Sequence, residues 1–299
     1  MSVSAVVANP AKTRWYVGAV PIVLVAWSVV FAQGTYRLLP PETIQQRLSQ
    51  FGGSDRQRET RLKEWFNAAG CGEHLSEQAV KGYSGSNLIC VLPGESEERI
   101  VVGAHYDHVD RGSGVADNWS SASLLPSLYE GLKQSPRKHT FVFIAFACEE
   151  LGLAGSKYYV DHLGAAERSK ISAMINMDTL GLGPTEIWYS HADKHLAGAI
   201  AIVSQKMKLP VTGMNVDGVG ESDGESFAKY KIRNITIHSV TTETLHILHS
   251  KDDNMNAIKL GDYMDSYYLI AAYLAAVDPY IGSPADVGTA TKADVSGKK

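Results

Sequence analysis

Cysteine is scarce in this sequence, with three residues in 299 and no Cys-x-x-Cys pair. This scarcity excludes a small fold held together by disulfides and leaves no cysteine-based zinc or redox motif. In an exported chain, three cysteines permit one disulfide and one remaining thiol. We favour Cys71 paired with Cys90, because Cys148 lies in an apolar, strand-like run; three separate buried thiols are the alternative.

Positive charge is not in excess either. Lys and Arg number 28 against 32 Asp and Glu, so the formal net charge is −4 and no basic field favours a nucleic-acid partner. The hydrophobic share of 44% and the charged share of 20% are typical of a folded globular protein, and no internal repeat is present. The length fits one large domain or two smaller ones, but no compositional break divides residues 41–280.

Acidic residues are absent from residues 1–40, and the segment from Trp15 to Ala32 carries no charge at all. A basic region over residues 1–14 followed by an apolar segment over residues 15–32 is typical of membrane targeting. The segment is either a signal peptide cleaved after Ala32 or an uncleaved membrane anchor, and Pro21 disfavours a buried core helix. Both alternatives place the rest of the chain outside the cytoplasm, in the periplasm or secreted.

Short apolar runs alternate with helix-like stretches along most of the remaining chain. Runs that are apolar throughout predict strands covered on both faces. We therefore predict a single α/β domain over residues 54–280, with a mixed, mostly parallel central sheet sandwiched between helices. A connector over residues 33–53 precedes it and a disordered tail over residues 281–299 follows it. The predicted strands are 87–92, 99–104, 140–147, 171–177, 186–189 and 234–239, and the predicted helices are 54–69, 120–133, 152–162, 194–207, 222–230 and 255–277.

Potential metal ligands follow three of the predicted strands. His105 follows the run 99–104, Glu149-Glu150 follows the run 140–147, and Asp178 follows the run 171–177. Ligands of open α/β sheets bind beyond the carboxyl ends of the strands, so these side chains point into one crevice. Asp117, in a glycine-rich loop, and two late histidines, His246 and His249, add further ligands. Imidazoles and carboxylates of this kind bind zinc or similar divalent ions.

Two of these motifs predict divided roles. Asp107 stands two residues beyond His105 and could accept its second imidazole N–H. After a strand, a turn could let one of Glu149 and Glu150 bind metal while the other acts as a base on water. Each residue alone has a simpler explanation as a turn or helix-capping residue, and it is their ordered combination that indicates a metal site. The other histidines are expected at the surface or behind the site.

Five ordered motifs resemble the bimetallic zinc aminopeptidase family, which also includes glutamate carboxypeptidases and glutaminyl cyclases. The resemblance covers residues 45–280. The motifs are Gly103-Ala104-His105-Tyr106-Asp107, Gly114-Val115-Ala116-Asp117-Asn118, Glu149-Glu150-Leu151-Gly152-Leu153-Ala154-Gly155-Ser156, Asn176-Met177-Asp178 and His249-Ser250-Lys251-Asp252-Asp253.

The resemblance implies a site for two zinc ions and an aminopeptidase acting on a peptide or aminoacyl substrate. His105 and Asp178 would bind one ion, Glu150 and His249 the other, and Asp117 would bridge them, followed by a cis peptide bond. Glu149 would be the catalytic general base and Asp107 would support His105. One departure concerns the family's Ser-Asp-His stretch, which reads Ser222-Asp223-Gly224 here and puts in doubt what that position contributes to substrate placement.

Two other functions remain open. Glutaminyl cyclases share the fold but use one zinc ion and transfer an acyl group within the substrate. A scaffold that kept the fold without catalysis would be expected to lack ligands or the base, and none is missing here. The choice between aminopeptidase, carboxypeptidase and dipeptidase depends on whether the crevice captures an amine or a carboxylate.

Overall fold

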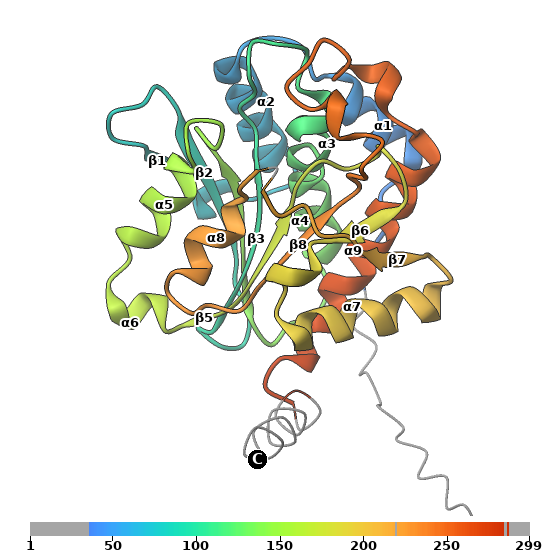
Figure 1. Ribbon diagram of the computed structural model, residues 1–299. Coiled ribbons are helices and arrows are strands. Elements are labelled where there is room, and N and C mark those ends of the chain that lie inside the picture. Colours follow the sequence, from blue (N-terminus) through green and yellow to red (C-terminus); the bar gives the residue numbers. More distant parts are fainter. Residues whose placement is uncertain (1–35, 219, 284–285, 287–299) are drawn as a thin grey trace, which may run out of the picture. The chain divides into compact units, whose positions relative to one another are not determined.

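A computed structural model of the chain describes residues 36–218, 220–283 and 286 (Figure 1). The predicted targeting segment 15–32 and most of the predicted tail lie outside these residues. Within the described part of the chain, no helix combines the length and the apolar character needed to cross a membrane.

One eight-stranded sheet forms the centre of the molecule, in the order β1-β2-β4-β3-β5-β8-β6-β7. The inner strands β4, β3, β5 and β8 are parallel, whereas β1 and β2 at one end and the β8–β6 pair are antiparallel. The predicted mixed, mostly parallel sheet is therefore confirmed. The strands are β1 (Leu75–Ala79), β2 (Ser86–Leu92), β3 (Arg99–His105), β4 (Thr140–Phe146), β5 (Ile171–Met177), β6 (Thr185–Ile187), β7 (Val211–Gly213) and β8 (Asn234–His238).

Helices cover both faces of this sheet (Figure 1). On one face, α5 (Ala154–Asp161) and α8 (Asp223–Ala228) enclose a core that includes Phe146 and Phe227. On the other face a larger core, which includes Phe66 and Ile175, lies beneath α2 (Asp55–Ala68), α4 (Leu125–Leu132), α7 (Lys194–Met207) and α9 (Leu260–Tyr280). The remaining helices are α1 (Pro41–Ser49), which contacts α9, the short α3 (Ser120–Ala122), and α6 (Ala165–Arg168) between α5 and β5.

Several predicted boundaries are wrong. The connector predicted over 33–53 contains α1, whose Ile44 and Leu48 are one helical turn apart and fully buried. The helix predicted over 120–133 is divided into α3 and α4, and α9 begins at Leu260 rather than at Met255. β1 and β7 were not predicted, because these short outer strands are largely exposed and carry no apolar run.

Two described residues of the predicted tail, Ile281 and Asp286, are buried. Asp286 accepts hydrogen bonds from Arg233 Nη1, at 2.9 and 3.0 Å, and from the main-chain N–H of Gly282 at 2.8 Å. Asp286 is therefore attached to the body by these hydrogen bonds.

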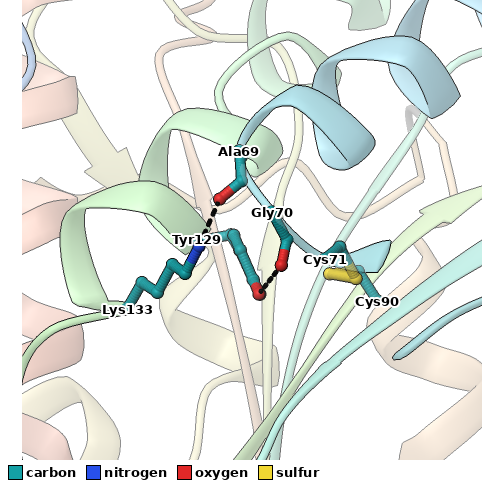
Figure 2. The surroundings of a disulfide bond; sticks show 6 residues. All are labelled: Ala69, Gly70, Cys71, Cys90, Tyr129 and Lys133. Atoms are coloured by element: carbon teal, nitrogen blue, oxygen red, sulfur yellow. Dashed lines mark hydrogen bonds between the residues drawn. A yellow bond between two sulfur atoms is a disulfide. The ribbon is translucent and has the colours of Figure 1, made fainter. Parts of the chain in front are cut away.

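A disulfide joins Cys71, just after α2, to Cys90 in β2 (Figure 2). The favoured pairing is confirmed and the alternative of three buried thiols is wrong. Cys148 is a buried free thiol. The disulfide attaches the end of α2 to the sheet that carries the candidate site.

Candidate metal centre

The ends of three neighbouring strands bring the predicted residues together. β4, β3 and β5 are adjacent and parallel, so their carboxyl ends lie at one edge of the sheet. His105 is the last residue of β3, Asp178 directly follows β5, and Glu149-Glu150 follow β4 after two further residues. These residues line a cleft of about 380 Å³. The crevice inferred from the strand ends is thus present.

Asp117 lies between two histidines. Its Oδ1 is 3.3 Å from Nε2 of His105, and its Oδ2 is 3.2 Å from Nε2 of His249. The peptide bond between Asp117 and Asn118 is cis, as the resemblance implied. One carboxylate therefore faces one imidazole with each of its two oxygens.

All five predicted ligand residues fall into two groups that share Asp117. One group is His105, Asp117 and Asp178; the other is Asp117, Glu150 and His249, and the ligand atoms within each group lie within 4.8 Å of one another. His249 Nε2 is also 3.0 Å from Glu150 Oε2, whereas His246 belongs to no such group among the described residues. The structure therefore favours His249 over His246.

Glu149 lies at the edge of this arrangement. Its Oε2 is 3.9 Å from Nε2 of His105, and together with His105 and Glu150 it forms a third close group. Burial, with the nearby carboxylates of Asp223 and Asp178, raises the pKa of Glu149 well above its usual range. Burial and neighbouring negative charge therefore both favour the protonated form of this carboxyl group.

Asp107 does more than lie beside His105, where the sequence predicts that it accepts the second imidazole N–H. Its carboxylate is 3.7 Å from Nδ1 of His105, and its main-chain oxygen is closer at 3.3 Å. Asp107 Oδ1 accepts a hydrogen bond from the main-chain N–H of Glu149 at 3.0 Å, and Oδ2 accepts one from Glu150 at 3.1 Å. Asp107 thus fixes the turn that carries both glutamates as well as lying beside His105.

The charges in the cluster fit a divalent cation. Burial and the neighbouring Asp117 raise the pKa of Glu150 to about 7, and its Oε1 is buried without a hydrogen-bond partner. A hydrogen bond to Asp117, and the nearby Glu150, raise the pKa of His249 to about 9. Although burial opposes it, hydrogen bonds from both imidazoles lower the pKa of Asp117. Imidazole nitrogens and carboxylate oxygens in this number are a donor set that zinc accepts, and zinc would remove the repulsion among the carboxylates.

Comparison with protein families agrees with this geometry. A family model described as peptidase family M28 matches residues 87–274, which is more than half of the chain. The chain belongs to peptidase family M28. The matched segment contains all of the residues of the candidate site.

Two curated relatives carry names that describe activities. The M28 chain is 32% identical over 230 residues to leupeptin-inactivating enzyme 1 of Streptomyces exfoliatus, covering 70% of this chain and 50% of that protein. It is 42% identical over 82 residues to aminopeptidase YwaD of Bacillus subtilis, covering 27% of this chain and 18% of that one. The chain thus spans at most half of the length of these relatives.

Solved structures show the same fold. A zinc aminopeptidase from Bacillus subtilis has a TM-score of 0.58 and 25% identity, covering 64% of this M28 chain and 49% of that one. LapA aminopeptidase of Legionella pneumophila has a TM-score of 0.68 and 22% identity, covering 79% and 70%. A glutaminyl cyclase from an Acidobacteriales bacterium has a TM-score of 0.70 and 15% identity, covering 83% and 98%. The last two likenesses concern the fold alone.

Apolar side chains also line the cleft in this M28 chain. They are Leu153, Trp188, Val216, Val240, Leu245 and Leu248. His238 lies among them and is buried, and burial lowers the pKa of this imidazole to about 4. Its Nδ1 accepts a hydrogen bond from the N–H of Val240, so Nε2 is the nitrogen that donates to Met214 O. His238 is therefore a neutral part of the cleft wall.

Two supporting residues were not singled out from the sequence. Asp253 accepts hydrogen bonds from the main-chain N–H groups of Ala116 and Asp117, at 2.7 and 3.2 Å. Asn118 Nδ2 donates to Met177 O, and its Oδ1 accepts from Thr179 N–H, so that its carboxamide spans Asp178. Asp253 and Asn118 each end one of the five motifs, but no local pattern in the sequence indicates their supporting roles.

The Ser222-Asp223-Gly224 departure has a structural correlate. Asp223 is fully buried, and burial raises the pKa of its carboxyl to about 7. A Cβ atom at Gly224 would lie 3.1 Å from Asn234 Oδ1 and 3.2 Å from Thr236 Oγ1. A side chain at this position would therefore require small shifts of these two side chains.

Proposed function

We propose that this chain is a zinc-dependent exopeptidase, and specifically an aminopeptidase that removes N-terminal residues from peptides. The observation that carries the proposal is the Asp117 carboxylate, whose two oxygens face His105 and His249 separately. A carboxylate placed in this way suits a bridge between two metal ions. Membership of peptidase family M28 and the names of the relatives support the reaction class.

The ligand assignment follows from the two groups that share Asp117. His105 and Asp178 would hold one zinc ion, Glu150 and His249 would hold the other, and Asp117 would contact both. Other divalent ions could occupy the same donor set. Asp107 would hold Glu149 and Glu150 in position, because its carboxylate accepts a hydrogen bond from the main-chain N–H of each.

Zinc ions bound at these residues would supply Lewis acidity toward the scissile carbonyl and increase the acidity of the attacking water. Glu149 is the proposed general base, because its carboxylate lies beside the ligands, with Oε2 3.9 Å from Nε2 of His105, and belongs to neither of the groups that share Asp117. It takes the proton of the water as the water attacks the carbonyl carbon. It then returns that proton to the nitrogen of the leaving amine as the peptide bond breaks.

We infer the orientation of the substrate from the polar and apolar residues that line the cleft. Glu221 also lines the cleft, is exposed and is not a proposed zinc ligand, so its carboxylate would favour a positively charged α-amino group, which argues for an aminopeptidase over a carboxypeptidase. The apolar side chains, which include Trp188 and Leu248, offer a surface for an uncharged side chain. We place this activity outside the cytoplasm, and the disulfide supports that location.

Metal stoichiometry and hydrolysis test the proposal on the purified full chain. Zinc content is measured together with the release of chromophore from a panel of aminoacyl substrates, before and after chelation and after zinc is added back. Two zinc ions per chain with chelator-sensitive hydrolysis would support the aminopeptidase. One zinc ion with cyclisation of a peptide bearing N-terminal glutamine would favour the cyclase instead, and a chain that binds no metal would overturn both enzymes.

A further inference from the structure

A buried arginine outside the matched family segment contacts the loop that carries the central carboxylate. Arg58 lies on α2, well before residue 87, where the family match begins. Its side chain is fully buried, which is rare for an arginine unless its donors are satisfied. No role for it follows from the metal ligands alone.

The guanidinium donates four hydrogen bonds to main-chain carbonyl groups. Nε donates to Phe51 O at 3.1 Å, and Nη1 donates to Tyr106 O at 3.1 Å. Nη2 donates to Ser113 O at 2.5 Å and to Gly114 O at 3.0 Å. Three of the four acceptors therefore belong to one loop.

This loop connects two residues of the candidate metal centre. Tyr106 directly follows His105, and Gly114 precedes Asp117 by three residues. Arg58 thus joins the beginning of the loop to its end through Nη1 and Nη2. Because the fork of a guanidinium is planar and rigid, it sets the spacing of these carbonyl groups.

Neighbouring groups hold the same loop in place. Asp253 accepts from the N–H of Ala116 and Asp117, and its own carbonyl accepts from Ser113 N–H at 2.8 Å. The Arg58 guanidinium also lies over the ring of Trp119, 5.4 Å from its centroid. The segment on both sides of Asp117 is therefore fixed from α2 as well as from the loop that carries His249.

Nearby carboxylates compensate the buried charge. Burial lowers the pKa of Arg58 to about 10, while Asp55, Asp253 and Asp107 act in the opposite direction. The side chain therefore remains protonated at neutral pH and keeps all of its donors. A lysine would keep the charge but could not reproduce the fork.

We infer that Arg58 is a positioning residue of the metal centre: it holds the loop between His105 and Asp117 so that both side chains can bind the same metal ion. The inference rests on the proposed function. It assigns to α2, which precedes the matched family segment, a part in setting zinc affinity. Arg58 itself contacts neither metal nor substrate.

Zinc affinity of the full-length Arg58→Lys chain tests the inference, with Arg61→Lys as the matched control. Arg61 lies on the same helix and over the same Trp119 ring, but it donates to Gln50 O and Gly52 O and leaves the loop untouched. Affinities are measured by competition with a chromophoric chelator, at temperatures where circular dichroism shows each apo chain to be folded. We expect Arg58→Lys to weaken zinc binding about 10- to 100-fold, as the loss of ligand-supporting contacts does elsewhere. Arg61→Lys should change it by no more than about twofold.

Chemical rescue provides a second measurement that does not depend on the lysine variant. In Arg58→Ala, guanidinium at a concentration that leaves the wild type folded should restore zinc affinity, whereas ammonium at the same ionic strength should not. Equal zinc affinities in the wild type and in Arg58→Lys, or equal rescue by both ions, would overturn this inference alone. A wild-type chain that binds no zinc would overturn the proposed function, and the inference with it.

Discussion

Glu149 and Glu150 are adjacent in the chain and differ in their surroundings. Glu150 Oε2 is 3.0 Å from Nε2 of His249, whereas Glu149 Oε2 is 3.9 Å from its nearest imidazole nitrogen, Nε2 of His105. The main-chain N–H groups of both glutamates donate hydrogen bonds to the Asp107 carboxylate, so a single side chain fixes the turn that separates the two glutamates. The division of roles between ligand and base can therefore be examined one residue at a time.

Replacing Glu149 with Gln removes the proposed proton carrier and keeps the size of the side chain. We expect turnover of aminoacyl substrates to fall by about 10²- to 10⁴-fold, the usual contribution of a general acid–base group. Zinc content, measured by atomic absorption on the same sample, should stay at the wild-type level. Loss of zinc in this variant would show that Glu149 is a ligand, and Glu150→Gln, which is expected to lose zinc, serves as the comparison.

His238 predicts a pH dependence of stability. Its pKa in the folded chain is about 4, because of burial, against a usual value of 6.5. As the pH falls below 6.5, the unfolded chain takes up this proton before the folded chain does. The stabilisation is therefore fully present above pH 6.5 and is lost as the pH falls toward 4, by about 3 kcal/mol in total.

Urea unfolding of the wild type and of His238→Gln at several pH values between 7 and 4 measures this contribution. The difference in free energy of unfolding between the two chains should move by about 3 kcal/mol over that range, in favour of the variant at low pH. Two curves that stay parallel from pH 7 to pH 4 would contradict the assignment. Because both chains contain the same other titratable groups, the difference between the two unfolding free energies cancels the contributions of those groups.

At the scale of elements, the end of α2 shows how neighbouring helices stabilise one another (Figure 2). Gly70, just after the helix, has a φ of +90°, the left-handed region in which glycine commonly ends a helix. From α4, Tyr129 OH donates to Gly70 O at 3.2 Å. From the residue that follows α4, Lys133 Nζ donates to Ala69 O at 3.0 Å. These side chains satisfy carbonyl groups that the helix itself leaves unpaired.

Lys133→Met should lower the free energy of unfolding by about 1 kcal/mol, because it removes a charged donor from the end of α2. Lys133→Arg, which keeps a cationic donor, should lose less. Denaturant unfolding of the three chains measures the effect. A methionine variant as stable as the wild type would show that water replaces the lysine without cost.

The strands of this fold were easier to predict than its helix boundaries. β3, β4 and β5 are buried on both faces, so their sequences are mostly apolar and predict strands without information from the rest of the chain. α1 depends on two buried side chains, Ile44 and Leu48, in an otherwise polar segment. Such a short helix is stabilised by packing against the rest of the chain, and its local pattern is correspondingly weak.

At the scale of the whole molecule, the disulfide connects the layer formed by α2 to the sheet. It closes a segment of 19 residues between Cys71 and Cys90 and is buried. Replacing both cysteines with alanine should lower the free energy of unfolding by about 3 kcal/mol, since the unfolded chain then regains conformational freedom. A reductant should bring the wild type to the level of the double variant and leave the double variant unchanged. A double variant as stable as the oxidised wild type would contradict this.

The inner strands and the positions of the candidate ligands could be predicted from short segments of the sequence. The apolar runs predicted the inner strands, and the residues that end them predicted where ligands gather, because parallel strands end at one edge of the sheet. The five motifs indicated the resemblance to the family, and that resemblance implied His249 as a ligand. Each strand and each motif was identified from residues that are close together in the chain.

The tertiary structure alone decided how those segments face one another. Asp253 reaches the N–H of Ala116 across 137 positions of sequence, and Arg58 reaches Gly114 O across 56. The burial of His238 and the placement of the two oxygens of Asp117 likewise depend on side chains contributed by different loops. The physical reason is that hydrogen bonds and burial depend on proximity in space, whereas local sequence patterns report only which faces of a strand or helix are apolar.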